Sequence, residues 1–378
     1  MNTFQFDDIR FYADTEVPGA LQELTKNPMF LQYGKMFLPN WTEQQFIDCL
    51  LSLQSVHAFQ KEIIYPNLQN ILSQSSNGLS VSGLEELPKD GSYLYISNHR
   101  DIIFDPASLD ICLVESGRDT VAIAIGNNLF VMPWIEKLVK LNKNFTVIRD
   151  AVGRDFVTQS QRLSAYIQKT IVEDNTSIWI AQREGRAKDG NDNTHPALLK
   201  MLGLSTKDNY IEHFKALQIV PMAISYEFDP CDLMKAKELY LKAQGTYQKT
   251  PEDDLKSMVI GMTGKKGRIH LALGKVLKEE LEALKELRKN HQIKALAKLI
   301  DTKIHQNYHL WSSNYIALDI LNNTNEYAHF YPKYYFDYFV QYIEEKLDTL
   351  DQDMDRASIR QLMLEMYANP VKNQLGLV

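Results

Sequence analysis

The stretch 93-YLYISNHRDIIFDPASLDICLVESG-117 decides the fold predicted for this chain of 378 residues. It opens with an apolar run of strand length, YLYIS, and ends with the helical pattern PASLDICLVESG. Between them lies a polar loop that contains a histidine, an arginine and two aspartates. A strand followed by a helix is one βα unit, the element from which α/β proteins with parallel sheets are built.

The same alternation of strand and helix continues to about residue 276. Candidate strands are SYLYIS (92–97), TVAIAIG (120–126), FTVIR (145–149), SIWIA (177–181), IVPMAISY (219–226) and RIHLALG (268–274). Helical patterns lie between them at 106–117, 132–141, 155–173 and 209–217. This order predicts an α/β fold, in which a mostly parallel or mixed sheet carries helices on both faces.

Helical patterns extend the chain at both ends of this α/β segment. The sequence predicts an N-terminal helical region over 1–77, in which Thr42 caps a helix, and a Ser/Asn/Gly stretch near 73–83 marks its boundary. The α/β domain is expected over 78–276. A C-terminal helical region is expected over 277–378, where the aromatic residues of YYFDYF are predicted to pack in a core.

Composition excludes several classes of protein. The net charge of −7 argues against a general nucleic-acid-binding protein. Three widely spaced cysteines form no CxxC pair and fit a reducing compartment. We see no secretory signal and no run of ~18 apolar residues long enough to span a membrane. The expectation is a cytoplasmic protein.

Polar residues cluster where the candidate strands end, and ligands of parallel sheets bind at this edge. After YLYIS, His99 is followed by two aspartates, Asp101 and Asp105. An imidazole that has a carboxylate partner can remove a proton near neutral pH, which typically contributes ~10²–10⁴-fold in rate. Asp101 also suits the N-cap of the following helix, so Asp105 is the favoured partner and Asp101 the alternative.

Other interpretations of this loop fit less well. A kinase catalytic loop requires a metal-binding Asn where Pro106 stands, and the chain has no DFG motif. A metal site would need further ligands, and the spacing from His99 to His195 matches no known pattern. A serine hydrolase would be expected to show GxSxG, which GLSVSG at 78–83 does not match.

Cationic residues after two other strands suggest an anionic substrate. Arg149 follows FTVI, and Arg186, with Lys188 nearby, follows SIWIA within QREGRAKDG. Guanidinium groups bind phosphate oxygens in pairs. Gly185 would let the backbone approach a ligand closely. A phosphate-bearing acceptor is therefore expected.

Four blocks together resemble the glycerolipid acyltransferases, which acylate glycerol 3-phosphate or lysophosphatidate. They are NHRDIIFD, similar to the family's His-x4-Asp block, then KNFTVIRD, IAQREGRAKDG and IVPMAISYE. The order matches that of the family, and the resemblance covers roughly 78–276. Two departures stand out. Five residues separate His99 from Asp105 where the family has four. The third block lacks one residue that the family has between Gly185 and Arg186, and Arg183 replaces a proline.

The resemblance implies the activity and its site. An acyl chain would pass from acyl-CoA or acyl-carrier protein to the hydroxyl of glycerol 3-phosphate or a lysolipid, without a metal or organic cofactor. His99 would act as the general base, oriented by Asp105. Arg149, Glu184, Gly185 and Arg186 would form the phosphate-binding site. Because the product is a lipid, peripheral contact with the inner face of a membrane is also expected, through an apolar patch on the terminal helices.

A different lipid acceptor, such as a lyso-aminolipid, is the alternative within the same enzyme class. Outside it, the altered block spacing leaves a non-catalytic protein that binds lipid or acyl carrier.

Overall fold

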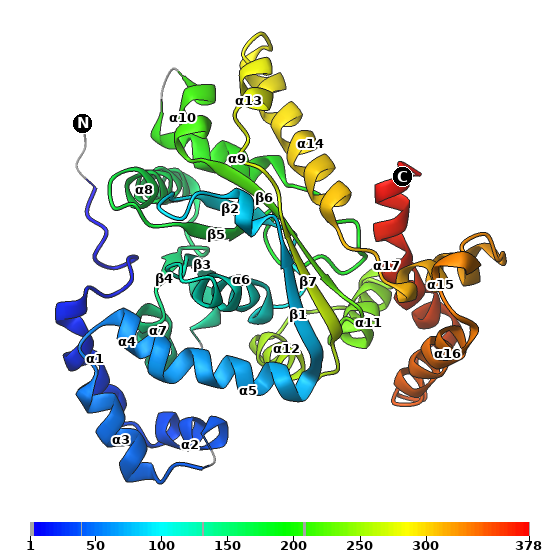
Figure 1. Ribbon diagram of the computed structural model, residues 1–378, viewed down its shortest axis with the longest axis horizontal. Coiled ribbons are helices and arrows are strands. Elements are labelled where there is room, and N and C mark those ends of the chain that lie inside the picture. Colours follow the sequence, from blue (N-terminus) through cyan, green and yellow to red (C-terminus); the bar gives the residue numbers. More distant parts are fainter. Residues whose placement is uncertain (1–3, 39, 131, 207–208, 378) are drawn as a thin grey trace.

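A seven-stranded mixed sheet forms the centre of the computed structural model, which describes residues 4–377 except 39, 131 and 207–208 (Figure 1). The strands lie in the order β1-β7-β6-β2-β5-β3-β4. Their bounds are β1 Ser76–Ser82, β2 Leu94–Ser97, β3 Ala122–Gly126, β4 Asn144–Val147, β5 Ile178–Ala181, β6 Ile219–Tyr226 and β7 Gly267–Leu273. All six predicted strands are present, which confirms the α/β fold class.

Five neighbouring strands, β6, β2, β5, β3 and β4, run parallel to one another. β7 pairs antiparallel with β6, and β1 pairs parallel with β7. The register places Ser97 of β2 opposite Ala181 of β5 and Met222 of β6. The five parallel strands therefore end at the same edge of the sheet, where β1 and β7 begin.

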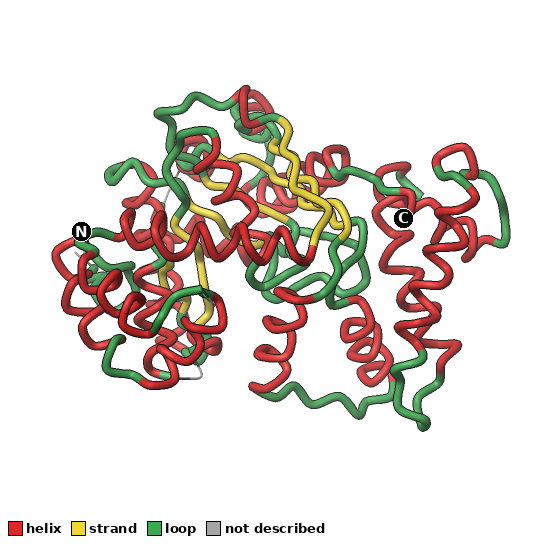
Figure 2. The backbone as a smooth tube through the Cα atoms, turned by 60° about the horizontal axis from the view of Figure 1, so that its bottom comes forward, coloured by secondary structure: helices red, strands yellow, loops and turns green. Residues whose placement is uncertain are grey.

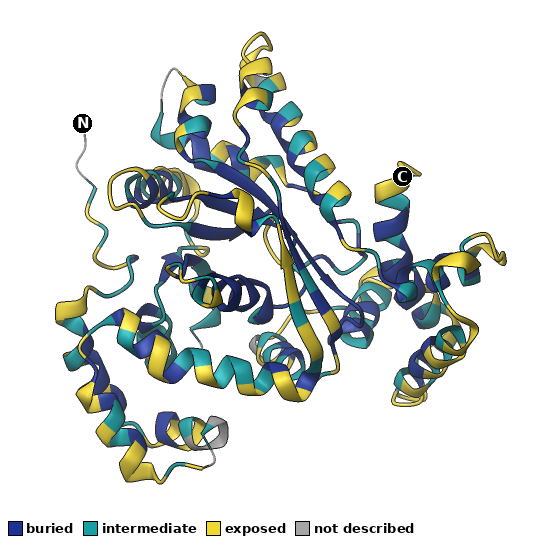
Figure 3. Ribbon diagram, in the orientation of Figure 1, coloured by how far each residue is buried: buried dark blue, intermediate teal, exposed yellow. Residues whose placement is uncertain are grey.

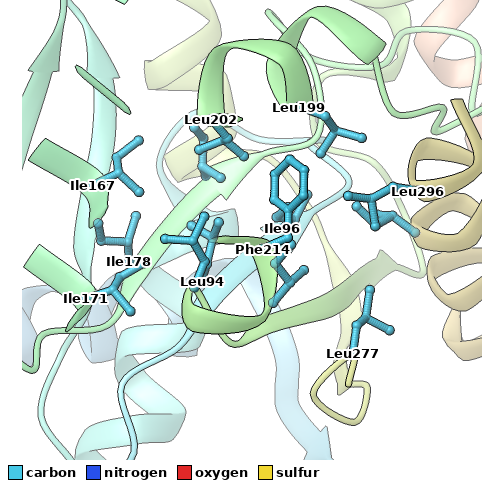
Figure 4. Close-up of a cluster of buried hydrophobic side chains, with 14 of the residues drawn as sticks. Leu94, Ile96, Ile167, Ile171, Ile178, Leu199, Leu202, Phe214, Leu277 and Leu296 are labelled. Atoms are coloured by element: carbon cyan, nitrogen blue, oxygen red, sulfur yellow. The ribbon is translucent and has the colours of Figure 1, made fainter. Parts of the chain in front are cut away.

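Side chains of β2 alternate between two hydrophobic cores, as the period of a strand requires. Leu94 and Ile96 enter one core together with Phe214, whereas Tyr95 enters the other together with Phe104. Figure 4 shows the first core, and Figure 3 shows that the central strands are buried. Burial on both faces explains why these strands appear in the sequence as continuous apolar runs.

Helices cover both faces of the sheet. Those of the α/β segment are α6 Phe104–Glu115, α7 Pro133–Leu141, α8 Gly153–Val172, α9 Pro196–Leu202, α10 Tyr210–Ala216, α11 Asp232–Ala243 and α12 Pro251–Thr263. Short 3-10 turns are Leu84–Glu86, η4 Asn127–Leu129 and Gly203–Ser205. In Figure 1, α8, α9 and α10 lie on one face, and α6 and α12 lie on the other.

The N-terminal region is helical, as predicted. A 3-10 turn, Asp14–Glu16, precedes α1 Val17–Leu24, α2 Pro28–Phe37, α3 Glu43–Ser52, α4 Val56–Phe59, a π-helical turn Gln60–Ile64 and α5 Tyr65–Ser75. Thr42 caps α3, because its side chain accepts from the Gln45 amide at 3.2 Å. Beyond α5, the Ser/Asn/Gly stretch was expected to break the pattern at a domain boundary. The helical pattern does end there, at Ser75, and the stretch continues as strand β1, which pairs with β7 and was not predicted.

The C-terminal region consists of α13 Glu279–Ala283, α14 Lys289–Asn307, α15 Ser312–Asn322, a 3-10 turn Ala328–Phe330, α16 Lys333–Leu347 and α17 Arg356–Leu375. α14 packs on the sheet, whereas α15, α16 and α17 share a separate core with Phe228 and α11. Of the aromatic residues predicted to pack, Phe339 is buried and Tyr335 and Phe336 are half-buried, whereas Tyr334 is exposed.

The helices α1, α2 and α3 lie at one end of the molecule and α15, α16 and α17 lie at the other, with the sheet between them (Figures 1 and 2). In the part of the chain that the structure describes, every helix is too short or too polar to cross a membrane. Three helices of the α/β segment, α9, α11 and α12, have no counterpart among the predicted elements. Of these, α12 matters most because it contacts the polar edge of the sheet.

Candidate active site

His99 and Asp105 meet in the loop between β2 and α6. His99 Nδ1 lies 2.7 Å from Asp105 Oδ2, and the same oxygen accepts from the amides of Arg100 (2.5 Å) and Asp101 (3.0 Å). Asp105 is fully buried in the first turn of α6, whereas the His99 side chain is 14% exposed. Because Asp105 Oδ2 also accepts from two backbone amides, it acts as the acceptor toward the ring, which places the imidazole proton on Nδ1 and leaves Nε2 able to accept a proton.

Asp101 has a different role in the same loop. Its Oδ1 accepts from the amides of Ile103 (2.9 Å) and Phe104 (2.7 Å), so it holds the turn that leads into α6, although the N-cap residue of α6 itself is Ile103 rather than Asp101. Burial and the neighbouring Asp105 carboxylate raise the pKa of Asp101. Its Oδ2 is buried, has no hydrogen-bond partner among the described residues, and faces Gly261 of α12, where a Cβ would collide with it.

Tyr226 holds the other oxygen of Asp105. The tyrosine is the last residue of β6, and its hydroxyl donates to Asp105 Oδ1 at 2.8 Å. Burial and the Asp105 carboxylate raise the pKa of Tyr226 well above its usual value, so the hydroxyl keeps its proton. Trp179 of β5 meets the His99 ring edge-on, with 5.4 Å between ring centroids. Three neighbouring strands therefore fix the orientation of the pair.

The loop after β5 is bound directly to the histidine. The amide of Ala187 donates to the carbonyl oxygen of His99 at 2.9 Å. Gly185 has φ +71°, in the left-handed region, which lets the chain turn before Arg186. Arg186 Nη2 donates to Ser257 Oγ of α12 at 2.8 Å, whereas its Nη1 is buried and has no partner among the described residues. One unpaired guanidinium nitrogen of Arg186 is therefore held beside the loop between β2 and α6, which we call the histidine loop (98–103).

Arg149 lies beyond β4 and meets the same loop. Its Nη1 lies 2.8 Å from Glu184 Oε1, and the Glu184 side chain is 80% exposed. The Arg149 amide donates to Asn127 Oδ1 at 3.0 Å, so η4 holds its backbone. A Cβ at Gly126 would collide with the Arg149 side chain, which explains a glycine at the end of β3. This arginine is more accessible than Arg186 and is already paired.

Arg100 of the His-Arg-Asp triplet has a structural role. It is buried against Asp192, with its guanidinium 5.6 Å from the centre of the Tyr308 ring. Lys235 of α11 donates to the Arg100 carbonyl oxygen at 2.8 Å and pairs with Asp229. These contacts hold the backbone and the Arg100 side chain of the loop between β2 and α6 in place. Lys188, the further cation of the β5 loop, pairs instead with Glu238 of α11 at 3.0 Å.

The other reactive side chains singled out in the sequence lie in ordinary structural settings. His195 is the N-cap of α9, where Nδ1 accepts from the Ala197 amide at 3.3 Å. Burial raises the pKa of Cys112 to about 12 and that of Cys231 to about 11, so neither thiol ionises near neutral pH. Among the described residues, no group of three or more His, Cys, Asp or Glu side chains could hold a metal ion.

Several groups that build the site were not predicted from the sequence. Tyr226 stands within a predicted block, but its contact with Asp105 spans 121 positions. Ser257 and Gly261 belong to a helix that was not expected, although Thr250 followed by Pro251 is a recognisable helix start. These contacts depend on chain segments that only the fold brings together.

A comparison with family models matches residues 78–225 to the family described as Acyltransferase. A search of the curated proteins found no match for this chain. Among solved structures, the chain is similar to the crystal structure of the 1-acyl-sn-glycerophosphate (LPA) acyltransferase PlsC from Thermotoga maritima. The identity is 13%, with 75% of this chain and 91% of that chain covered and a TM-score of 0.35.

The matched segment contains the His99–Asp105 loop, Arg149 and the Glu184–Arg186 loop. The chain thus carries an acyltransferase domain, and the protein is an O-acyltransferase. Tyr226 and all of α12 lie beyond the end of the matched segment.

Proposed function

We propose that this O-acyltransferase moves a fatty acyl chain from acyl-CoA or acyl-carrier protein to the hydroxyl of glycerol 3-phosphate or 1-acylglycerol 3-phosphate. One observation carries the proposal. The amide of Ala187, the residue after Arg186, donates to the carbonyl oxygen of His99, whose imidazole is hydrogen-bonded to Asp105. This contact supports the proposal because it links the backbone of the proposed proton acceptor to that of the proposed phosphate-binding cation.

In this mechanism His99 is the general base, and Asp105 orients it. His99 Nε2 takes the proton of the acceptor hydroxyl while the oxygen attacks the thioester carbonyl carbon. The tetrahedral intermediate then collapses, the carbon–sulfur bond breaks, and the leaving thiolate takes the proton back from the imidazolium. The Asp105 carboxylate stabilises the imidazolium between these two steps, as in the acyl-transfer triads.

The acceptor phosphate would be bound by Arg186 and Arg149. Arg186 Nη1 is buried without a protein partner among the described residues, a costly state that a phosphate oxygen would relieve. Arg149 would exchange its exposed partner Glu184 for the phosphate or bridge both. Holding the acceptor in this way places its hydroxyl at the histidine, and such positioning supplies much of the acceleration in two-substrate reactions.

Contact with a lipid surface is proposed at the rim of this site rather than on the aromatic C-terminal helix. At the start of α8, three residues after Arg149, Val152 is 80% exposed and Phe156 is 57% exposed. On α12, Leu255 and Val259 are also exposed and lie one turn apart. Apolar side chains at this rim would enter the bilayer surface where a lipid product leaves the site.

Thiol release from an acyl donor tests the proposal. Wild type should release thiol from acyl-CoA or acyl-carrier protein only with a phosphate-bearing acceptor, and His99→Ala should abolish release. His57→Ala is the matched control, because His57 also lies near an aspartate, Asp119 at 4.0 Å, but is 74% exposed and outside the site.

The acceptor panel separates the alternatives. Release with a lyso-aminolipid but not with glycerol 3-phosphate or 1-acylglycerol 3-phosphate would replace the proposed acceptor. Release without any acceptor, together with free fatty acid, would indicate a hydrolase. No release with either donor would favour a binding protein, and full activity of His99→Ala would refute the general base.

A further inference from the structure

The two oxygens of Asp105 have different partners. Oδ2 accepts three N–H groups, from His99 and from the amides of Arg100 and Asp101. Oδ1 accepts the Tyr226 hydroxyl at 2.8 Å. The first set belongs to the histidine loop itself, whereas the second comes from a different strand. Tyr226 is thus the contact through which β6 acts on Asp105.

Tyr226 is held in one orientation by the sheet. Its backbone pairs with Ile269 of β7, and its side chain is buried in the core that also contains Phe104 of α6. Adjacent residues point to the opposite face, as alternation along a strand requires. Glu227, for example, pairs with Arg268 at 2.9 Å. The hydroxyl therefore cannot leave Asp105 without movement of the strand.

We infer that Tyr226 is a positioning residue for the proposed reaction, and that its hydroxyl sets how strongly Asp105 holds the protonated imidazole of His99. The inference rests on the proposed function. A hydrogen bond from a hydroxyl draws electron density from a carboxylate, so it weakens the attraction of that carboxylate for a neighbouring cation. It also fixes the carboxylate plane, so that Oδ2 stays aimed at Nδ1.

Loss of the Tyr226 hydroxyl should change the pH dependence of the rate, whereas a loss of packing alone should not. With one donor fewer, Asp105 attracts the imidazolium more strongly, and His99 stays protonated to higher pH. The acid limb of the pH–rate profile should then move to higher pH, because the general base must be neutral. The Michaelis constants of donor and acceptor should not change, since the buried Tyr226 has no access to substrate.

The experiment compares two phenylalanine variants. Tyr226→Phe should lower kcat about tenfold and raise the acid limb by about one pH unit, with both Michaelis constants unchanged. Tyr342→Phe is the matched control: Tyr342 is also buried, and its hydroxyl donates to a buried carboxylate, Asp232 at 2.6 Å, outside the site. It should leave the profile in place.

A second measurement keeps the test informative if Tyr226→Phe does not fold. Site-specific 3-fluorotyrosine at position 226 keeps the shape of the side chain but makes the hydroxyl a stronger donor, so the acid limb should move to lower pH. An acid limb that stays in place in the variants that fold would overturn the inference.

His99→Ala, measured in parallel, reports on the proposed function separately. If it kept full activity, the general base itself would be wrong, whatever Tyr226 did.

Discussion

Two buried aspartates of this protein, Asp105 and Asp232, have similar surroundings, but we propose different roles for them. Each stands in the first turn of a helix, α6 or α11, and each accepts from tyrosine hydroxyls. Asp105 accepts from Tyr226, whereas Asp232 accepts from Tyr342 at 2.6 Å and Tyr367 at 2.9 Å. Burial raises the pKa of Asp232 in spite of the nearby Lys346.

The two aspartates differ in the other side chains that donate hydrogen bonds to them. The last partner of Asp105 is an imidazole that reaches the exposed edge of the sheet. Both tyrosine partners of Asp232 are buried side chains of α16 and α17, so this carboxylate fastens the C-terminal helices to α11. In the proposed mechanism, the tyrosine–aspartate contact at Asp105 supports chemistry because the imidazole partner of Asp105 can also touch a substrate.

The largest expected effect separates the two carboxylates directly. Asp105→Asn should lower kcat/KM for acyl transfer by about 10³-fold, because it removes the charge that stabilises the imidazolium. Asp232→Asn should leave kcat/KM unchanged and lower the free energy of unfolding. Steady-state kinetics and urea denaturation of both variants measure this. Equal losses of kcat/KM would show that the comparison is wrong.

Arg186→Ala should lower kcat/KM about a hundredfold for acceptors that carry a phosphate, because a charge-assisted and partly buried contact is lost. The effect should be absent with glycerol or a monoacylglycerol. Arg154→Ala, an exposed arginine in the first turn of α8, is the matched control. An equal loss with phosphate-free acceptors would assign Arg186 to structure alone.

A third buried carboxylate, Asp110 of α6, accepts from a backbone amide rather than from a tyrosine or histidine, and it should make the free energy of unfolding depend on pH. Its Oδ1 accepts from the Val121 amide at 2.9 Å, and burial raises its pKa to about 7. The folded protein holds the proton of Asp110 more tightly than the unfolded chain does. The contribution of Asp110 to the free energy of unfolding is therefore greatest at low pH. It is lost as the pH rises from about 4 to about 7.

Asp110→Asn mimics the protonated form and removes that dependence. Between pH 5 and pH 8, the variant should gain roughly 2 kcal/mol of unfolding free energy relative to wild type. Urea denaturation at both pH values measures the difference. A constant difference between variant and wild type would show that Asp110 does not titrate in this range.

The smallest effect is expected at the tyrosine partners of Asp232. Tyr342→Phe should cost about 1 kcal/mol of unfolding free energy, the usual contribution of one hydrogen bond, because Tyr367 still donates to Asp232. Its thermal transition, compared with that of the double variant Tyr342→Phe/Tyr367→Phe, shows whether the two hydroxyls act together. A double variant as stable as the single one would contradict the role given to Asp232.

Sequence patterns predicted most of the fold because they record local burial. The six apolar runs were recognisable as strands because most of their residues are buried, and Thr42 was recognisable as a cap from its own neighbours. β1 was missed because Ser, Asn and Gly dominate it, and pairing with β7 alone makes it a strand. In the same way, α12 was missed although its helix start was visible.

What the sequence by itself determined about the site is the set of chemical groups that each loop carries: a histidine with two aspartates, and arginines after two other strands. The sequence favoured Asp105 over Asp101 as the partner of His99, but only the tertiary structure places the Asp105 carboxylate against the imidazole. The same is true of Tyr226 and Ser257. Their hydrogen bonds join segments far apart in the chain, and no local pattern encodes such a distance.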